Sequence, residues 1–211
     1  MLRHRRNKRG LKLTKQQNAL PTLIIPPLPQ EITPPHRKEE HFVFKHPFTM
    51  TVSGVTSCGK TYFVKQLLQS SHKFIQPTLQ RIIWLYKRWQ PLYDEIQRTV
   101  TPRVEFVQRI AIDLEKDSYI DPSVRNLIVL DDLMATAAKD HRITDLFTEG
   151  SHHRNLSVVV LNQNLYHSKD PTQRRNCQYQ VLFKNPVDKQ QIITLGRQMY
   201  PGKVPYFLQK F

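Results

Sequence analysis

Apolar residues recur along this chain in short blocks that alternate between two periods. Compact apolar runs predict buried strands at residues 48–53, 81–86, 104–107, 127–130, 156–161 and 179–183. Between these runs, apolar residues spaced three or four apart predict helices at residues 60–70, 91–100, 136–148 and 188–199. A last apolar stretch, residues 206–211, is interpreted as a terminal strand.

The alternation of strands with helices predicts the fold class. Apolar strands that each lead into a helix favour an α/β fold with a mostly parallel sheet covered by helices on both faces. Polar residues gather where several of these strands end. In open sheets of this kind, ligands bind at the carboxyl ends of the strands, so we expect the functional site there.

The first 40 residues differ in composition from the rest. Residues 1–15 carry seven Lys or Arg side chains, and no acidic residue occurs before Glu31. Residues 21–35 contain six prolines, which is typical of an extended linker. We therefore predict a basic, proline-rich, flexible tail over residues 1–40 and one globular domain over residues 41–211, with the boundary near His41.

Charge narrows the class of partner. Thirty-two Lys plus Arg face seventeen Asp plus Glu, which gives a net charge of +15 and a pI near 10.0. Such a balance is typical of a protein that binds a polyanion, either nucleic acid or an anionic membrane, although charge also serves solubility. The longest apolar runs fall far short of a membrane span. Two cysteines are too few for a disulfide scaffold and indicate a reducing interior.

One motif carries most of the chemical information. Residues 54–61 fit the phosphate-loop pattern G-x-x-x-x-G-K-[ST], directly after a predicted strand and at the start of a predicted helix. The expected nucleotide-binding residues are Gly54, Val55, Thr56, Ser57, Cys58, Gly59, Lys60 and Thr61. The glycines let the backbone wrap a phosphate, Lys60 reaches the β- and γ-phosphates, and the Thr61 hydroxyl binds Mg²⁺. ATP and Mg²⁺ are the predicted cofactors.

Two further strand ends carry candidate catalytic groups. Asp131 and Asp132 follow the apolar run at residues 127–130, as in a Walker B motif, so Asp131 is the expected metal ligand and Asp132 the expected base for the attacking water. An ordinary turn after a buried strand is the alternative. Gln163 follows the run at residues 156–161 and can sense the γ-phosphate, although Asn162 and Asn164 compete for that role and a turn residue is equally in keeping with the pattern.

The basic and aromatic candidates are less specific. Arg154 is a candidate arginine finger acting in a neighbouring subunit, and Arg174 with Arg175 is a second candidate; each is also in keeping with a surface or DNA-contacting arginine. His152 and His153 lack partners at zinc-ligand spacing. We expect Trp84 in the core. Trp89 is expected to pack in the core as well, with stacking on a base as the alternative.

Taken in order, these motifs resemble the FtsK–HerA group of P-loop ATPases, and more narrowly the poxvirus-type genome-packaging ATPases of DNA viruses and virus-like transposons. The resemblance covers roughly residues 45–203. It rests on the segments 54–61, 89–93, 127–134, 147–155, 161–165, 182–186 and 197–201. The second Walker B acid in that group is usually Glu, whereas this chain has Asp132, which is one methylene shorter.

The resemblance implies a RecA-like sheet, ATP hydrolysis, and a homo-oligomeric ring that pumps double-stranded DNA into a capsid. It also implies a capsid or portal partner, and a location in the virion, the host nucleus or a virus factory. Three alternatives share some of the motifs. They are a DNA helicase or DNA-transfer ATPase, a P-loop kinase, which the charge of +15 argues against, and a DNA-binding protein that hydrolyses nothing.

Overall fold

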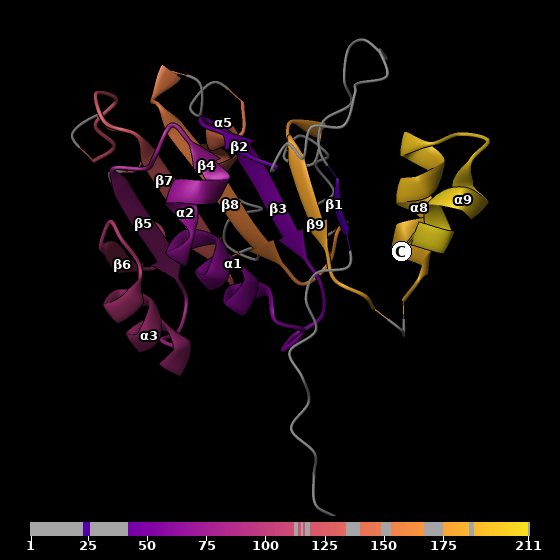
Figure 1. The fold of residues 1–211 in the computed structure, drawn as a ribbon, viewed down its shortest axis with the longest axis horizontal. Helices are drawn as coiled ribbons and strands as arrows, with labels where there is room; N and C mark the ends of the chain where they lie inside the picture. The colour runs from indigo at the N-terminus through magenta and orange to yellow at the C-terminus, as the bar shows by residue number, and fades with distance from the viewer. Residues whose placement is uncertain are drawn as a thin grey trace, which may run out of the picture.

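A seven-stranded sheet forms the centre of the protein (Figure 1). The computed structural model describes residues 23–25, 42–111, 114, 116, 119–133, 140–148, 153–166, 175–185 and 188–210. The sheet has the order β1-β9-β3-β8-β7-β5-β6. Its strands are β1 (Leu23–Ile25), β3 (Thr49–Ser53), β5 (Arg81–Tyr86), β6 (Val104–Gln108), β7 (Asn126–Asp131), β8 (Leu156–Asn162) and β9 (Tyr179–Leu182).

All strand pairs in this sheet are parallel except that of β1 with β9. The predicted α/β class with a mostly parallel sheet is therefore confirmed, and the six predicted strands from residue 48 to residue 183 are present within a residue or two of their expected ends. A parallel pair needs a crossover, and helices supply the crossovers here, so the strands are covered on both faces.

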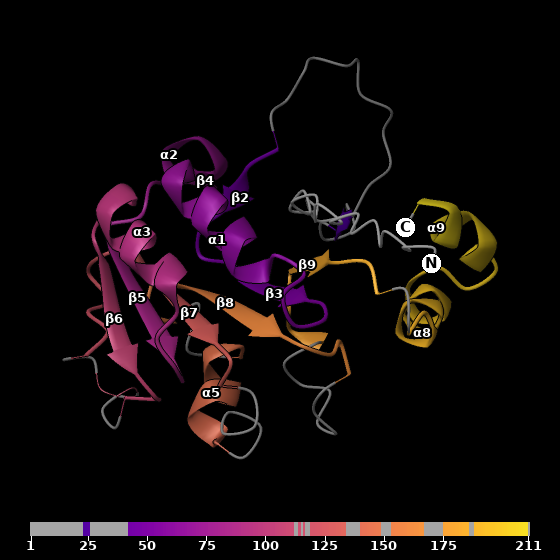
Figure 2. The same ribbon diagram turned by 90° about the horizontal axis from the view of Figure 1, so that it is seen from below.

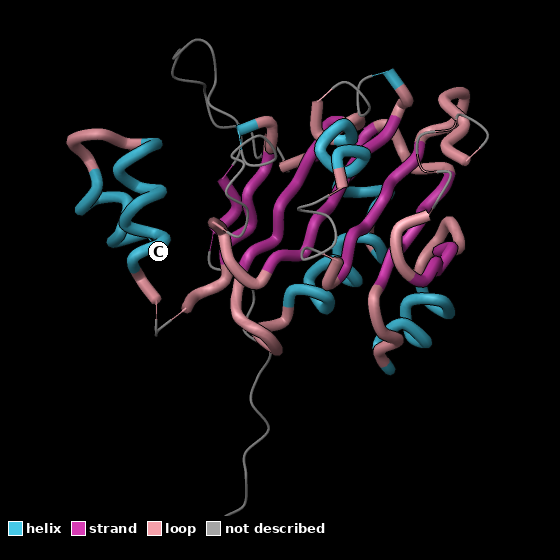
Figure 3. Tube along the Cα trace, turned by 180° about the vertical axis from the view of Figure 1, so that it is seen from behind, coloured by secondary structure: helices cyan, strands magenta, loops and turns pink. Residues whose placement is uncertain are grey.

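Helices lie on both sides of the sheet (Figure 2). Their bounds are α1 (Lys60–Gln69), α2 (Ser71–Phe74), α3 (Pro91–Thr99), α5 (His141–Leu146), α8 (Gln190–Met199) and α9 (Val204–Lys210). Helices α1 and α3 cover one face, and α5 covers the opposite face, which is turned toward the viewer in Figure 3. Neighbouring residues of β5 separate accordingly, because Trp84 packs in the core cluster with α1 and α3 while Ile83 packs in the cluster with α5.

The C-terminal residues form a helix, so the predicted terminal strand at 206–211 is wrong. Pro205 has no amide hydrogen for a sheet ladder, but it fits the first turn of a helix. Phe207 then packs beside α8, where a Cβ added to Gly196 would lie 2.8 Å from the ring. The rings of Tyr200 and Phe207 stack at 5.4 Å. Aromatic packing on α8 thus determines the structure of this end.

Four smaller elements were missed by the sequence pattern. Strands β2 (Phe44–Lys45) and β4 (Ile75–Gln76) form a separate two-stranded parallel sheet, and α2 precedes β4. β1 lies inside the segment predicted as a linker and adds a short edge strand to the main sheet. Each element is only two to four residues long, which is too short to show a period. The first part of the predicted helix at 136–148 lies outside the described residues, and α5 forms its second part.

A buried polar network closes the amino-terminal edge of the sheet. His46 Nδ1 lies 2.6 Å from Ser157 Oγ, and His46 Nε2 lies 2.9 Å from Asn155 Oδ1. The Phe48 amide also donates to Ser157 Oγ. Burial lowers the pKa of His46 below its ordinary value, although its bond to Asn155 works in the opposite direction. The neutral imidazole therefore ties β8 to the segment that leads into β3.

Candidate functional site

The phosphate loop lies at the carboxyl end of β3, and its two glycines are required for different reasons. Gly54 is buried, and a Cβ placed on it would lie 2.6 Å from Phe183 Cβ and 2.7 Å from Cys58 Sγ. Gly59 has φ 102° and Ser57 has φ 62°, both in the left-handed region. The sequence pattern thus has a steric cause at its first glycine and a conformational cause at its second.

The loop delivers the chain into α1 with an open amino terminus. Gly59 is the N-cap residue of α1, and it makes no side-chain capping bond; no acidic residue occupies the first turn. The amides of the first helical turn have no intrahelical acceptor, and the helix dipole concentrates positive charge there. This end of α1 therefore fits a phosphate group, which would accept hydrogen bonds from these amides.

Lys60 folds back over the loop. Its ammonium donates to the Gly54 carbonyl at 2.7 Å and to the Val55 carbonyl at 2.8 Å. Burial lowers the pKa of Lys60, and the charges of Cys58, Asp131 and Asp132 oppose that shift. The side chain thus holds its charge close to the loop that would cradle the phosphates.

A hydroxyl and a carboxylate converge beside the loop. Thr61 Oγ1 donates to Asp131 Oδ2 at 3.4 Å, across a sequence separation of 70 residues. Asp131 ends β7 and is 5% exposed. Burial raises its pKa, and hydrogen bonds from Tyr93 and Thr61 act against that rise. Two oxygen ligands at this position, one of them a carboxylate, suit Mg²⁺.

Tyr93 is a site residue that the sequence analysis did not single out for chemistry. Its hydroxyl donates to Asp131 Oδ2 at 2.8 Å, and its ring is fully buried in α3. Burial raises the pKa of Tyr93 far above its ordinary value, and the negative charge of Asp131 raises it further. The phenol therefore keeps its proton and remains a hydrogen-bond donor. The segment 89–93 belonged to the family resemblance, but nothing in its spacing indicated a contact with residue 131.

The remaining strand ends surround the loop. Asp132 is exposed and has φ 55°, so the chain turns directly after β7. Its charge acts on the pKa of both Lys60 and Asp131, after the larger effect of burial. Asn162 is buried and pairs in register with Ser53, and its carbonyl accepts from the Gly54 amide at 3.1 Å. Gln163 and Asn164 are exposed.

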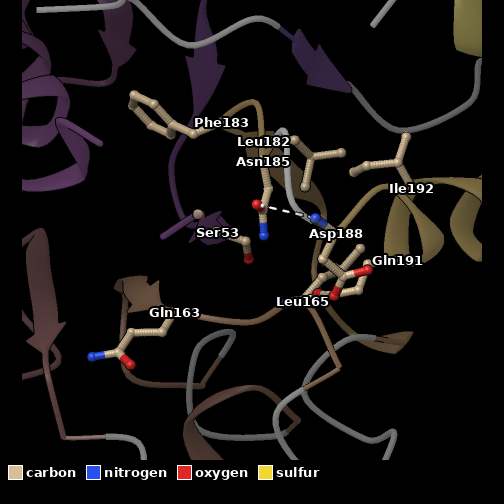
Figure 4. A pocket seen from close by; sticks show the side chains of 10 residues that line it. Ser53, Gln163, Leu165, Leu182, Phe183, Asn185, Asp188, Gln191 and Ile192 are labelled. Atoms are coloured by element: carbon tan, nitrogen blue, oxygen red, sulfur yellow. Dashed lines mark hydrogen bonds between the residues drawn. The ribbon is translucent and has the colours of Figure 1, made fainter. Parts of the chain in front are cut away.

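Gln163 and Gly54, the first residue of the loop, line one small open pocket, whose lining side chains are drawn in Figure 4. Ser53 and Gly54 line it on one side, and residues that follow β9 line it on the other. The Ser53 hydroxyl is buried without a hydrogen-bond partner among the described residues. Of the three competing amides, Gln163 is the one that lines this pocket, whereas Asn162 serves the sheet with its main chain.

Arg154 lies far from the loop of its own chain. It precedes β8 and donates to the Leu114 carbonyl at 3.0 Å, at the amino edge of the sheet. β8, about 20 Å long for its seven residues, separates it from Gln163. Arg174 and His152 lie outside the described residues, and Arg175 and His153 are exposed. In the described part of the chain, no group of three or more His, Cys, Asp or Glu side chains is arranged to hold a metal ion.

The two tryptophans differ in burial, although both were expected to pack in the core. Trp84 is fully buried in the core, as predicted. Trp89 packs against Tyr86, Tyr93 and Phe106, with ring centroids 5.2 to 5.5 Å apart, yet 44% of the residue is exposed. Core packing therefore describes only part of the Trp89 surface.

Comparison with solved structures supports the same fold. The cytoplasmic domain of EssC aligns with a TM-score of 0.53 and 14% identity, covering 75% of this chain and 34% of that one. This chain thus spans about a third of the EssC chain. B204, the DNA-packaging ATPase from Sulfolobus Turreted Icosahedral Virus, aligns with a TM-score of 0.55 and 11% identity, covering 78% of this chain and 88% of that one. At such identities these likenesses show the fold.

Comparison with protein families gives a more specific result. No curated protein matches the chain, and no described helix is long and apolar enough to cross a bilayer. The family described as "Poxvirus A32 protein" matches residues 37–199, which is most of the chain and includes every candidate site residue named above. The chain therefore belongs to the poxvirus A32 protein family, within the group of viral P-loop ATPases that its motifs resemble.

Proposed function

We propose that this protein is an ATP-driven motor that moves double-stranded DNA into a viral capsid. The observation that carries the proposal is the convergence of Thr61 and Asp131 beside a phosphate loop with an open helix terminus. Membership of the poxvirus A32 family and a fold shared with a DNA-packaging ATPase support it. The net charge of +15 suits a motor that holds DNA through its phosphates.

In this proposal each site residue has one role. Bound Mg²⁺·ATP supplies the phosphoanhydride bond whose hydrolysis drives the motor. The loop amides and the first turn of α1 bind its phosphates, and Lys60 exchanges its carbonyl acceptors for phosphate oxygens. Thr61 and Asp131 would hold the metal. Asp132 takes a proton from the attacking water, and Gln163 orients that water from the pocket beside the loop.

The motor works as an assembly in this proposal. Identical subunits form a ring around the DNA, and an arginine from the next subunit completes each site, with Arg154 and the pair Arg174/Arg175 as candidates. A capsid or portal component holds the ring at the site of packaging, which places the protein in the virion, the virus factory or the nucleus. Residues 1–15, with their seven Lys or Arg side chains, add basic charge that could contact DNA phosphates.

The first experiment measures ATP hydrolysis by the purified protein with and without double-stranded DNA, at low and at high salt. DNA should stimulate hydrolysis, high salt should remove the stimulation, and Lys60→Ala should abolish activity at both salt concentrations. An equal rate of ATP hydrolysis with and without DNA would refute the motor proposal. A strand-separation assay runs in parallel, because unwinding of a duplex would favour a helicase instead.

A further inference from the structure

Two neighbouring strands end in a group of exposed cations and one exposed indole. Lys87, Arg88 and Trp89 follow β5, and Arg109 follows β6; we call these four residues the β5–β6 tip. Tyr86 and Gln108, the last residues of the two strands, are paired in register, so the tip residues emerge side by side. β6 is the outermost strand, and the tip therefore occupies a corner of the sheet (Figure 1).

The backbone of the tip is fixed by hydrogen bonds between its two halves. The Arg109 amide donates to the Tyr86 carbonyl at 2.7 Å, and Gln108 Nε2 donates to the Lys87 carbonyl at 3.4 Å. Arg109 has φ 71°, in the left-handed region that side chains disfavour. A strained residue held by these contacts turns the chain at the end of β6.

The cations of the tip have no internal role. Lys87, Arg88 and Arg109 are exposed, and none of them forms an ion pair or a side-chain hydrogen bond among the described residues. The tip itself contains no acidic residue. On the neighbouring strand β7, Asp131 pairs in register with Tyr86, and Asp132 follows it; both belong to the metal and water site of the proposed function.

Trp89 gives the tip a rigid aromatic surface. Its ring packs on Tyr86, Tyr93 and Phe106, which hold it from one side, while 44% of the residue remains exposed. A large exposed indole beside cations is the combination with which proteins hold nucleic acid. On a duplex, cations contact the phosphates, and the ring can pack on a backbone sugar without regard to sequence.

We propose that the β5–β6 tip is a DNA-contacting surface, in which Lys87, Arg88 and Arg109 bind backbone phosphates and Trp89 packs against the same strand. This inference rests on the proposed function and adds the residues that would hold the DNA. The tip lies on the carboxyl edge of the sheet, where the phosphate loop also lies, because β3, β5 and β6 all run parallel. Tyr93 connects the two, since its ring contacts Trp89 and its hydroxyl contacts Asp131.

The first test uses the unmodified protein and its intrinsic fluorescence. The chain has two tryptophans, and Trp84 is fully buried, so a change in the emission of exposed indole reports on Trp89. Titration with a short DNA duplex of mixed sequence should quench that emission and protect it from acrylamide. Trp89→Phe should lose the signal while keeping its fold by circular dichroism. DNA binding, followed by anisotropy of a labelled duplex, that leaves Trp89 emission unchanged would overturn the proposal.

The second test removes charge at two places. The variant Lys87→Ala/Arg88→Ala/Arg109→Ala is compared with Lys45→Ala/Lys73→Ala/Arg103→Ala, which removes three exposed cations from segments away from the tip. The tip variant should bind the labelled duplex more weakly than the control variant. Its plot of log affinity against log salt should be shallower by about 1 for each cation removed. Equal affinities and equal slopes for the two variants would overturn the proposal.

Further measurements separate this inference from the proposed function. If DNA stimulates ATP hydrolysis in the wild-type protein and in both triple variants alike, the motor stands and the tip is not its DNA contact. If wild-type protein neither binds DNA nor is stimulated by it, both proposals fail. If the tip variant loses basal ATP hydrolysis and its oligomeric state by light scattering, the tip is a contact between subunits and the DNA assignment is overturned.

Discussion

Replacing Tyr93 by Phe tests whether the Tyr93 hydroxyl positions the metal ligand. The substitution removes one oxygen and keeps the ring, which packs among Trp84, Tyr86, Trp89 and Phe106. That oxygen donates to Asp131 Oδ2 at 2.8 Å in a buried setting. A hydrogen bond to a charged group contributes about 1.5–3 kcal/mol. Losing a partner that orients a metal ligand lowers metal affinity by about 10–100-fold.

The expected result is therefore a defect in the use of Mg²⁺. In Tyr93→Phe, the free Mg²⁺ concentration for half-maximal ATP hydrolysis should rise by about tenfold or more. Binding of a fluorescent ATP analogue in EDTA should stay close to the wild-type value, because the phosphate loop is untouched. The matched control is Tyr86→Phe, which removes a hydroxyl from the same aromatic cluster that has no bonding partner among the described residues. Equal Mg²⁺ requirements in the two variants would show that Tyr93 serves packing alone.

Two further predictions concern the phosphate loop and the amino edge of the sheet. Gly54→Ala should destabilise the fold by about 1–3 kcal/mol and abolish binding of the ATP analogue, because its Cβ would overlap Phe183; a melting temperature and affinity equal to wild type would contradict this close approach. His46, bonded to Ser157 and Asn155, has a pKa held by burial below its ordinary 6.5, so the unfolded state binds more protons as pH falls through that value. Unfolding by urea should therefore show lower stability at about pH 5.5 than at about pH 7.5, and His46→Gln should flatten that difference, whereas an unchanged difference would assign it to other groups.

Strand positions could be predicted from this sequence because they depend on local composition. The residues of β5, β7 and β8 are apolar enough to be buried on both faces of the sheet. Such continuous short apolar runs are typical of strands in a parallel sheet. The phosphate loop could be predicted as well, since its function places each glycine at a fixed spacing. In both cases the signal lies within a few consecutive residues.

The contacts that complete the site depend on the tertiary structure instead. The Tyr93 hydroxyl contacts Asp131, 38 residues later in the chain, because α3 packs on the face of the sheet near the carboxyl end of β7. In the sequence, Tyr93 is one more aromatic residue of an amphipathic helix. Similarly, the requirement for glycine at position 54 comes from Phe183, which follows β9 on the other side of the loop. No periodicity carries information about such pairs.

The location of Arg154 links the single subunit to the proposed assembly. Strand β8 holds Arg154 at the amino edge and Gln163 at the carboxyl edge, about 20 Å apart, so Arg154 does not reach the phosphate loop of its own chain. If Arg154 completes a nucleotide site, that site belongs to another copy, whose carboxyl edge must face the amino edge of this one. A contact between two different surfaces of identical subunits is heterologous, and repeated with closure it generates a ring. An Arg154 finger therefore requires a head-to-tail contact between copies, and a closed ring is one assembly that supplies such a contact at every site.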